Sequence, residues 1–219
     1  MRSKTPAKWH WGEPLEPIRR LLARGGVLAI PTESSYGLAV DPRSRSGVEA
    51  IFRFKQRESR KPLPVVVGGT HHLEQLGVEP GDERLLALAE LWPAPLTVVV
   101  PIAADLPAAA GTRSLGVRIP GHERLRRLLL ELDHGLTATS ANVSGRPPVL
   151  EPDELMRQLS ACDALVIDDG VLPGGEPSTV VALTATGLAL LRQGSYPWEA
   201  VSELEISASN AEILVDESS

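Results

Sequence analysis

The stretch GGVLAIPTESSYGLAVDP, residues 25–42, places two apolar runs on either side of a polar turn, and it decides the fold. The run 27–30 predicts a buried strand, because it is short, continuous and ended by Pro31. The run 38–40 predicts a second strand, closed by the turn pair Asp41-Pro42. The turn between them is rich in hydroxyls and lies at a strand end, where α/β sheets commonly bind ligands.

Outward from this stretch, helical and strand patterns alternate along the chain. Upstream, residues 18–22 have helical spacing and are stopped by Gly25-Gly26. Downstream, a capping box, Ser46-x-x-Glu49, predicts the start of a helix that ends near Lys55. Further strands are predicted at 63–67, 96–100, 116–119, 165–167, 179–183 and 188–191, the last two as a hairpin, and further helices at 82–92, 123–132 and 152–159. This alternation predicts a single α/β domain with a mixed sheet.

Length and composition limit the domain organisation. The chain has 219 residues and 42% hydrophobic residues, which suffices for one sizeable core. We expect an N-terminal extension at 1–15, the domain at 16–201, and an acidic, serine-rich tail at 202–219. The single cysteine, Cys162, excludes an internal disulfide and is expected to be a small buried side chain. No apolar run is long enough to span a membrane and no secretory signal is recognisable, so the sequence predicts a cytoplasmic protein without membrane contact.

Charge is unevenly distributed. The net charge of −6 argues against a protein that coats nucleic acid non-specifically, because such a protein has to neutralise many phosphates. Seven of the 22 basic residues nevertheless fall within 43–61. A local cationic patch on an acidic protein suits a small phosphorylated ligand, and a solvated helix face is the simpler alternative.

Standard catalytic motifs are missing. The chain has no G-x-x-x-x-G-K-[ST] and no G-x-G-x-x-G phosphate loop, and without G-x-S-x-G, Ser140 is a poor nucleophile candidate. His71-His72 are adjacent, which disfavours zinc and indicates a helix N-terminus. Asp168-Asp169 follow a predicted strand, where a turn is favoured over a magnesium site.

Polar groups collect at the predicted strand ends instead. TSAN (139–142), PST (177–179) and LRQG (191–194) join the polar turn of the opening stretch. Arg118 interrupts an apolar strand, where an unpaired charge would be costly, so it requires an anionic partner, either an internal carboxylate or a ligand. A turn or cap explains any one of these groups, but together they are what a site for a phosphate plus a carboxylate requires.

Taken in order, these segments resemble the YrdC-like family, the threonylcarbamoyl-AMP synthases. Lys55, Arg57, Ser140 and Asn142 meet the family's K-x-R…S-x-N signature, whereas Glu33-Ser34 stands where Asp-Thr is expected. The matching stretches are GGVLAIPTESSYGLAVDP (25–42), IFRFKQR with KPLPVVV (51–67), WPAPLTVVVP (92–101), GVRIPGH (116–122), TATSANVSG (137–145), GGEPSTVV (174–181) and LLRQG (190–194).

The resemblance implies a single-domain α/β fold, with a twisted mixed sheet and flanking helices around a large concave cavity. It implies Lys55 and Arg57 as catalytic cations, and it assigns no side chain to a metal. The residues implied to bind threonine are Thr32, Tyr36, Arg118 and Ser178. Those implied to bind the nucleotide are Lys55, Ser59, Ser114, Ser140, Asn142 and Arg192.

The resemblance also implies an activity. A nucleotidyltransferase of this kind makes threonylcarbamoyl-AMP and pyrophosphate from L-threonine, bicarbonate and ATP, with Mg²⁺ accompanying ATP. The product feeds the tRNA threonylcarbamoyl transferase machinery, which modifies an adenosine beside the anticodon. Two alternatives stay open: an RNA-binding or ribosome-associated module of the same fold, and a paralogue that uses another carbamoyl acceptor. A weak contact with tRNA or other RNA is left open as well.

Overall fold

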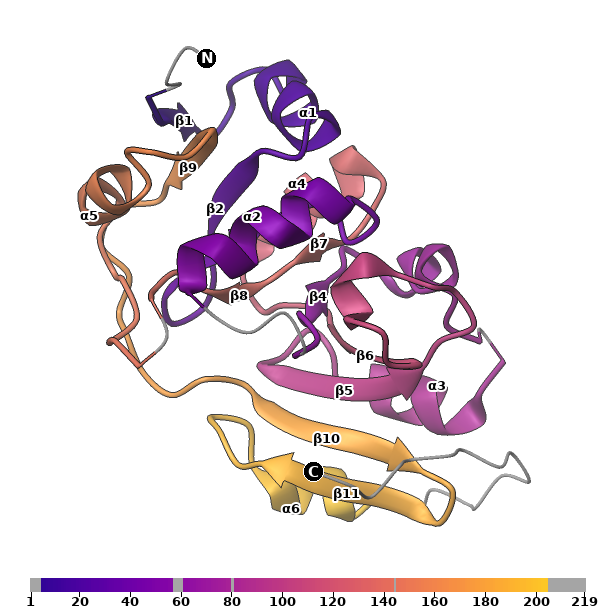
Figure 1. Ribbon diagram of the computed structural model, residues 1–219. Coiled ribbons are helices and arrows are strands. Elements are labelled where there is room, and N and C mark those ends of the chain that lie inside the picture. Colours follow the sequence, from indigo (N-terminus) through magenta and orange to yellow (C-terminus); the bar gives the residue numbers. More distant parts are fainter. Residues whose placement is uncertain (1–4, 57–60, 80, 144, 205–219) are drawn as a thin grey trace.

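Two mixed β-sheets organise the chain in the computed structural model, which describes residues 5–56, 61–79, 81–143 and 145–204 (Figure 1). The first sheet has the order β1-β9-β2-β3-β8. Its strands are β1 (Ala7–His10), β9 (Ala164–Asp168), β2 (Val27–Pro31), β3 (Tyr36–Ala39) and β8 (Thr139–Ser140). β1, β9 and β2 run parallel, whereas β3 is antiparallel to both β2 and β8. The strand β1 lies within the segment expected as an N-terminal extension.

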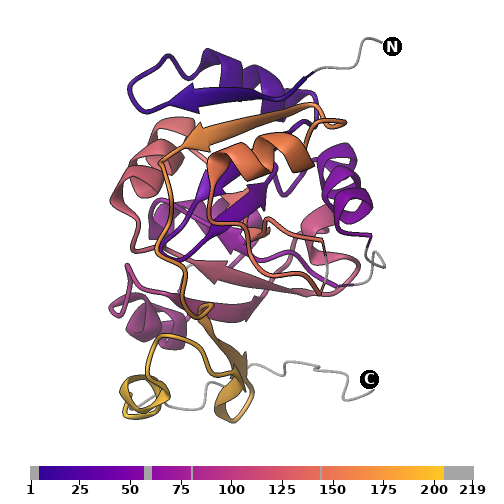
Figure 2. The same ribbon diagram turned by 90° about the vertical axis from the view of Figure 1, so that its left-hand side faces the viewer.

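The second sheet has the order β11-β10-β5-β6-β4-β7. Its strands are β11 (Gly187–Arg192), β10 (Thr179–Thr184), β5 (Leu96–Pro101), β6 (Ser114–Arg118), β4 (Val65–Val66) and β7 (Leu136–Thr137). The predicted hairpin is confirmed as β10 and β11. Figures 1 and 2 place β1 and β9 at one end of the molecule and this hairpin at the other. The predicted α/β class is therefore confirmed, but the strands are divided between two mixed sheets.

The helices of the described residues are α1 (Glu16–Ala23), α2 (Arg45–Lys55), α3 (Glu83–Ala89), α4 (Glu123–Leu132), α5 (Pro152–Gln158) and α6 (Trp198–Ser202), with short 3₁₀ segments η1 (Thr70–His72), η2 (Glu74–Leu76) and η3 (Pro107–Ala109). Of these, α1, α2 and α5 contact strands of the first sheet. Within the described residues, none of the helices combines the length and the apolar character needed to cross a membrane.

The position of β2 explains why residues 27–30 are all apolar and do not alternate between apolar and polar. Val27 and Ala29 belong to the larger hydrophobic cluster, whereas Leu28 and Ile30 point to the smaller cluster with α1 and α4. Successive side chains of a strand point to opposite faces, so both faces of β2 are covered and all its residues are buried. Each of the larger side chains contributes roughly 1.5–3 kcal/mol by leaving water.

The predicted start of α2 is wrong by two residues. The N-cap is Ser44, whose hydroxyl accepts a hydrogen bond from the Gly47 amide at 3.2 Å. Ser46, the predicted cap, already lies in the first turn. The helix ends at Lys55 as predicted, followed by Gln56 in the left-handed conformation.

Candidate active site

A cavity of about 550 Å³ opens where the two sheets approach each other. Its wall is formed by the 32–36 turn, the end of α2, β4, the end of β6, the segment 138–142, and residues 175–178 with Arg192. Cavities of this size are typical of small-molecule sites. The cavity thus brings together strand ends and turns that are far apart in the sequence.

One group of residues, which we call the lysine corner, consists of Lys55, Ser140 and Asn142. Lys55 is 3% exposed, and its Nζ donates to Ser140 O at 2.7 Å, to Asn142 O at 3.0 Å and to Asn142 Oδ1 at 3.3 Å. Ser140 Oγ donates to Asn142 Oδ1 at 2.6 Å, and Asn142 Nδ2 donates to Arg146 O. These contacts place a buried ammonium group at one end of the cavity.

The pairing of β8 with β3 places Ser140 next to the end of α2, where Lys55 lies. Ser140 pairs with Gly37 of β3, where a Cβ atom would lie 3.3 Å from Thr139 O. The Ala141 amide donates to Tyr36 O at 2.9 Å. Glycine at position 37 therefore allows β8 to approach β3 closely, and this pairing positions Ser140 beside Lys55.

A second group, the arginine corner, consists of Arg118, Glu33, Arg192, Ser178 and Thr97. Arg118 ends β6, and its side chain is 12% exposed. Its NH1 lies 3.3 Å from Glu33 Oε2, while Glu33 Oε1 accepts a hydrogen bond from the Gly121 amide. The anionic partner that the sequence requires for Arg118 is thus an internal carboxylate.

The second arginine of this corner approaches from β11. Arg192 NH2 donates to Ser178 O at 2.7 Å and contacts Ser178 Oγ at 3.4 Å, and Ser178 Oγ shares a hydrogen bond with Thr97 Oγ1 at 2.9 Å. Burial lowers the pKa of Arg118, Glu33 counteracts this, and the charge of Arg192 lowers the pKa of Arg118 again. An arginine stays protonated at neutral pH, so the corner carries two guanidinium charges.

The cavity is cationic as a whole. Among the described residues, its lining includes Lys55, Arg118 and Arg192 and no carboxylate. Such a surface, with hydroxyls and amides interspersed, attracts phosphates and carboxylates.

Tyr36 belongs to the lining and is fully buried. Its hydroxyl donates to Gly170 O at 2.9 Å and accepts from the Asp169 amide at 3.1 Å. Burial is the main cause that raises the pKa of Tyr36. The hydroxyl is therefore engaged by the loop after β9, and this loop fixes the tyrosine in the wall.

The two aspartates of that loop are engaged in ion pairs. Asp168 lies 2.8 Å from Lys8 Nζ. Asp169 accepts from Trp11 Nε1 at 2.5 Å and from Arg124 NH1 at 3.0 Å, and it lies 2.9 Å from His122 Nε2. Of the two predicted roles, the structure therefore supports that of a structural turn.

The structure brings most of the predicted site residues together. Those that line the cavity are Thr32, Tyr36, Lys55, Arg118, Ser140, Asn142, Ser178 and Arg192. Ser114 starts β6, at the opposite end of the strand from Arg118, and lies outside this lining. Arg57 and Ser59 fall outside the described residues. No role was predicted for Glu33 or Thr97. Thr97 could have been noticed, because it is a polar residue inside the valine-rich strand 96–100.

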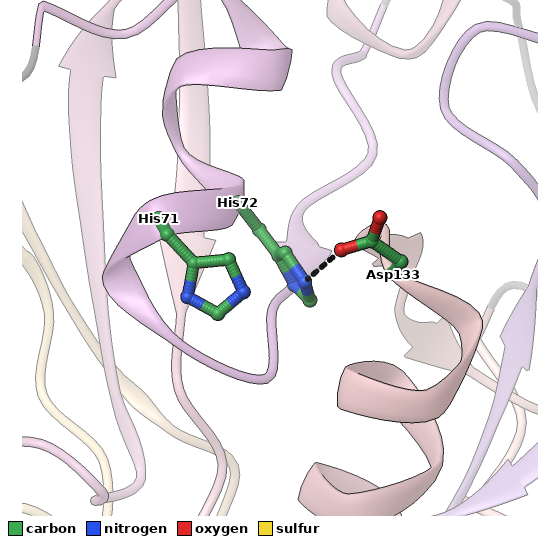
Figure 3. Close-up of side chains that lie close together, drawn as sticks. All are labelled: His71, His72 and Asp133. Carbon is green, nitrogen blue, oxygen red and sulfur yellow. Dashed lines mark ion pairs between the residues drawn. The ribbon is translucent and has the colours of Figure 1, made fainter.

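One group of side chains in the described part of the chain has the composition of a metal site, namely His71, His72 and Asp133 (Figure 3). Their ligand atoms lie within 4.8 Å of one another, outside the cavity. His72 Nδ1 accepts a hydrogen bond from the Gly68 amide at 3.3 Å, so the neutral ring carries its hydrogen on Nε2. A ligating Nε2 would need the opposite arrangement. The group instead links η1 to the end of α4, with His72 Nε2 3.7 Å from Asp133 Oδ1.

The chain is similar to several known proteins. A family profile described as telomere recombination, for Sua5, YciO and YrdC, matches residues 20–194. The chain is 36% identical over 175 residues to the threonylcarbamoyl-AMP synthase of Sodalis glossinidius, covering 77% of this chain and 89% of that protein. It is 32% identical over 186 residues to the enzyme of that name from Vibrio cholerae, covering 83% and 98%. The corresponding protein of Pyrococcus abyssi is 31% identical over 185 residues, which cover 84% of this chain, and the match spans about half (54%) of its length.

Two solved structures have the same fold. The P. abyssi Sua5 protein complexed with L-threonine superposes with a TM-score of 0.80 at 28% identity, over 93% of this chain and 62% of that one. Escherichia coli YciO superposes with a TM-score of 0.71 at 22% identity, over 86% and 94%. The second likeness shows the fold alone.

Proposed function

The chain belongs to the Sua5/YciO/YrdC family, and from this membership we propose that it synthesises threonylcarbamoyl-AMP from L-threonine, bicarbonate and ATP. The observation that carries the proposal is the convergence of three cations, Lys55, Arg118 and Arg192, on one cavity without a carboxylate among its described lining residues. The carbamate and ATP, which react with each other in the proposed adenylation step, are both anionic, so charge neutralisation and positioning account for most of its catalysis. The P. abyssi relative has been solved with L-threonine, which supports this acceptor.

We assign the amino acid to the arginine corner. The remaining N–H groups of Arg118 can hold the α-carboxylate, since a guanidinium offers five donors and NH1 makes the 3.3 Å contact with Glu33. The amine, once deprotonated, attacks the carbon of bicarbonate to form a carbamate, and the bicarbonate hydroxyl leaves with the N–H proton as water; with CO₂ as the donor, the N–H proton is lost to solvent. A carbamate oxygen then attacks the α-phosphorus of ATP, and the bond from that phosphorus to the bridging oxygen breaks to release pyrophosphate.

We assign the nucleotide to the lysine corner, with Ser140 and Asn142. The ammonium group of Lys55 already donates to three oxygen atoms, and an ammonium group has three N–H bonds. Lys55 therefore acts mainly through its charge and by ordering the 140–142 segment. It donates to a phosphate only if that phosphate replaces one of these three acceptor oxygens. We assign the boundary between the acceptor and nucleotide ends to Arg192, which donates to Ser178 O.

Magnesium enters this proposal with the substrate. Mg²⁺ prefers carboxylate and phosphate oxygens, and the described cavity lining offers no carboxylate. We therefore treat the ion as part of MgATP, where it offsets phosphate charge. Transfer of the threonylcarbamoyl group to tRNA is assigned to separate downstream enzymes, and we propose a cytoplasmic location because tRNA is modified there.

Release of pyrophosphate from ATP tests the proposal directly. We expect release to require both threonine and bicarbonate, with threonylcarbamoyl-AMP as the second product. Release with bicarbonate and a different amino acid would instead identify a paralogue with another acceptor. No nucleotide turnover together with steeply salt-dependent RNA binding would favour the RNA-binding alternative.

A further inference from the structure

Thr97 is a buried polar residue in the valine-rich strand β5, which lies between β10 and β6 in the second sheet (Figure 1). It is 5% exposed, and the part that remains accessible lines the cavity. Because a buried hydroxyl is costly without a hydrogen bond, Thr97 requires a polar partner at this position. The partner is Ser178, whose Oγ lies 2.9 Å from Thr97 Oγ1.

The methyl group and the hydroxyl of Thr97 have separate neighbours. A Cβ atom at position 116 of β6 would lie 3.1 Å from Thr97 Cγ2, so the methyl group packs where Gly116 leaves space. The hydroxyl points toward Ser178, which directly precedes β10. A β-branched side chain is restricted in its χ1 angle, so the packing of the methyl group also fixes the direction of the hydroxyl.

The two hydroxyl groups have two hydrogen atoms, and only one of them is used between the residues. Arg192 NH2 lies 3.4 Å from Ser178 Oγ, and a guanidinium only donates, so Ser178 Oγ is the acceptor there. The bond between Thr97 and Ser178 takes one hydroxyl hydrogen. Within the described residues, neither hydroxyl contacts a further acceptor. The second hydrogen is therefore left for an acceptor atom in the cavity, which both residues line.

The register of β5 and β6 brings Arg118 next to this pair of hydroxyls. Val98 pairs with Val117 in the antiparallel ladder, and the next residues along the two strands are Thr97 and Arg118. Side chains directly opposite each other in such a ladder lie on the same face, with Cβ atoms about 4.5–5.5 Å apart. A carboxylate bound to Arg118 therefore lies beside the hydroxyl pair and offers it an acceptor.

We propose that Thr97 positions the Ser178 hydroxyl to donate a hydrogen bond to the α-carboxylate of the acceptor amino acid. The inference rests on the proposed function, because it takes Arg118 as the residue that binds this carboxylate. Ser178 is the more exposed of the two residues, so we assign the second hydrogen to it. Thr97 then donates to Ser178 Oγ, which holds that side chain in one rotamer and polarises its O–H bond.

Titration calorimetry with L-threonine, in the absence of ATP, tests this role. In Thr97→Val, which exchanges the hydroxyl for a methyl group and keeps the β-branched shape, we expect the dissociation constant to rise about tenfold. In Thr97→Ser, which keeps the hydroxyl, we expect a value within about twofold of the wild type. Thr184→Val is the control, since it removes a hydroxyl at the far end of β10 that donates to Gly187 O, and it should leave the constant unchanged.

A double-mutant cycle with Ser178→Ala separates positioning from packing. If Thr97 acts through Ser178, Thr97→Val weakens binding in the wild type but has no further effect in the Ser178→Ala background. Equal weakening in both backgrounds overturns the proposal, and so does an unchanged dissociation constant in Thr97→Val. Binding by Thr97→Ser as weak as that of Thr97→Val also overturns it, because the methyl group would then be the part that matters. If Thr97→Val does not fold, Thr97→Ser and Thr97→Ala differ by the same hydroxyl and decide the question.

Pyrophosphate release distinguishes this inference from the proposed function. Threonine-dependent release by the wild type, together with an unchanged dissociation constant in Thr97→Val, contradicts the inference alone. A raised constant that is restored in Thr97→Ser, in a protein that releases no pyrophosphate, contradicts the proposed function alone. A wild type that does not bind L-threonine contradicts both.

Discussion

The lysine corner and the arginine corner hold their cations by different means. The Nζ of Lys55 is positioned by two backbone carbonyls and one amide oxygen, all within residues 140–142. Arg118 is positioned by the side chain of Glu33, which comes from a turn 85 positions earlier in the sequence. Backbone acceptors change little when neighbouring side chains change, whereas a side-chain partner can alter both charge and position with one substitution. Our proposal assigns the constant nucleotide to the first corner and the acceptor to the second, in keeping with this difference.

The largest effect is expected from Lys55→Met. Removing the ammonium group takes a positive charge from the nucleotide end and leaves buried oxygens of residues 140–142 without their donor. We expect turnover to fall about 10²–10³-fold and the free energy of unfolding to fall by about 1–3 kcal/mol. Steady-state pyrophosphate release and urea denaturation measure the two effects. Arg127→Met, which removes an exposed cation on α4, is the control and should change neither.

Retention of turnover in Lys55→Met would contradict the role of the lysine corner. A loss of stability with unchanged turnover would show that Lys55 only orders the 140–142 segment.

A smaller and more selective effect is expected from Arg118→Lys. Lysine keeps the charge but loses the planar fork that holds a carboxylate and Glu33 together. We expect the KM for threonine to rise about 10–100-fold and the KM for ATP to change little. A larger change in the KM for ATP would place the nucleotide, and not the acceptor, at the arginine corner. Arg192→Lys extends the test, because the contacts of Arg192 with Ser178 lie at the proposed boundary between the acceptor and nucleotide ends.

Tyr36 supports both corners, so a variant that weakens this support should affect threonine binding and ATP binding equally. Tyr36 follows the turn that carries Glu33, its carbonyl accepts from Ala141, and its hydroxyl is held by residues 169–170. In Asp169→Asn, we expect a loss of about 1.5–3 kcal/mol in unfolding free energy at pH 7. The KM values for threonine and ATP should rise by the same small factor, and a selective rise in either would contradict the shared role.

The same variant has a defined pH dependence. Burial raises the pKa of Asp169, but hydrogen bonds from His122 and Trp11 outweigh burial, so the folded-state pKa is lower than the ordinary value. A carboxyl group with a lowered pKa stabilises the fold above its unfolded pKa, and this contribution is lost as the pH falls through the folded value. The stability difference between wild type and Asp169→Asn should therefore narrow as the pH drops below the usual aspartate range. A difference that stays constant would contradict the ionic nature of these contacts.

The sequence predicted the local features of both corners and missed how they connect. The buried run of β2, the hairpin of β10 and β11, and the need of Arg118 for an anion follow from patterns within a few residues. The identity of its partner does not, because residues 33 and 118 belong to different sheets and meet only through the way these sheets pack. The division into two sheets was missed for the same reason, and β4 and β7, with two residues each, are too short to show a period.

The smallest effect concerns the start of α2, where the chain offers two serines, Ser44 and Ser46, and only Ser46 has a glutamate three residues later. The structure selects Ser44, whose hydroxyl accepts from the Gly47 amide, so Ser44→Ala should cost about 1 kcal/mol. Ser46→Ala is the matched control and should change the urea midpoint much less. Neither variant should alter the KM for ATP, because Lys55 lies at the far end of the helix and is held by residues 140–142. A shift in that KM with Ser44→Ala would mean that the register of α2, as well as those backbone acceptors, positions the lysine corner.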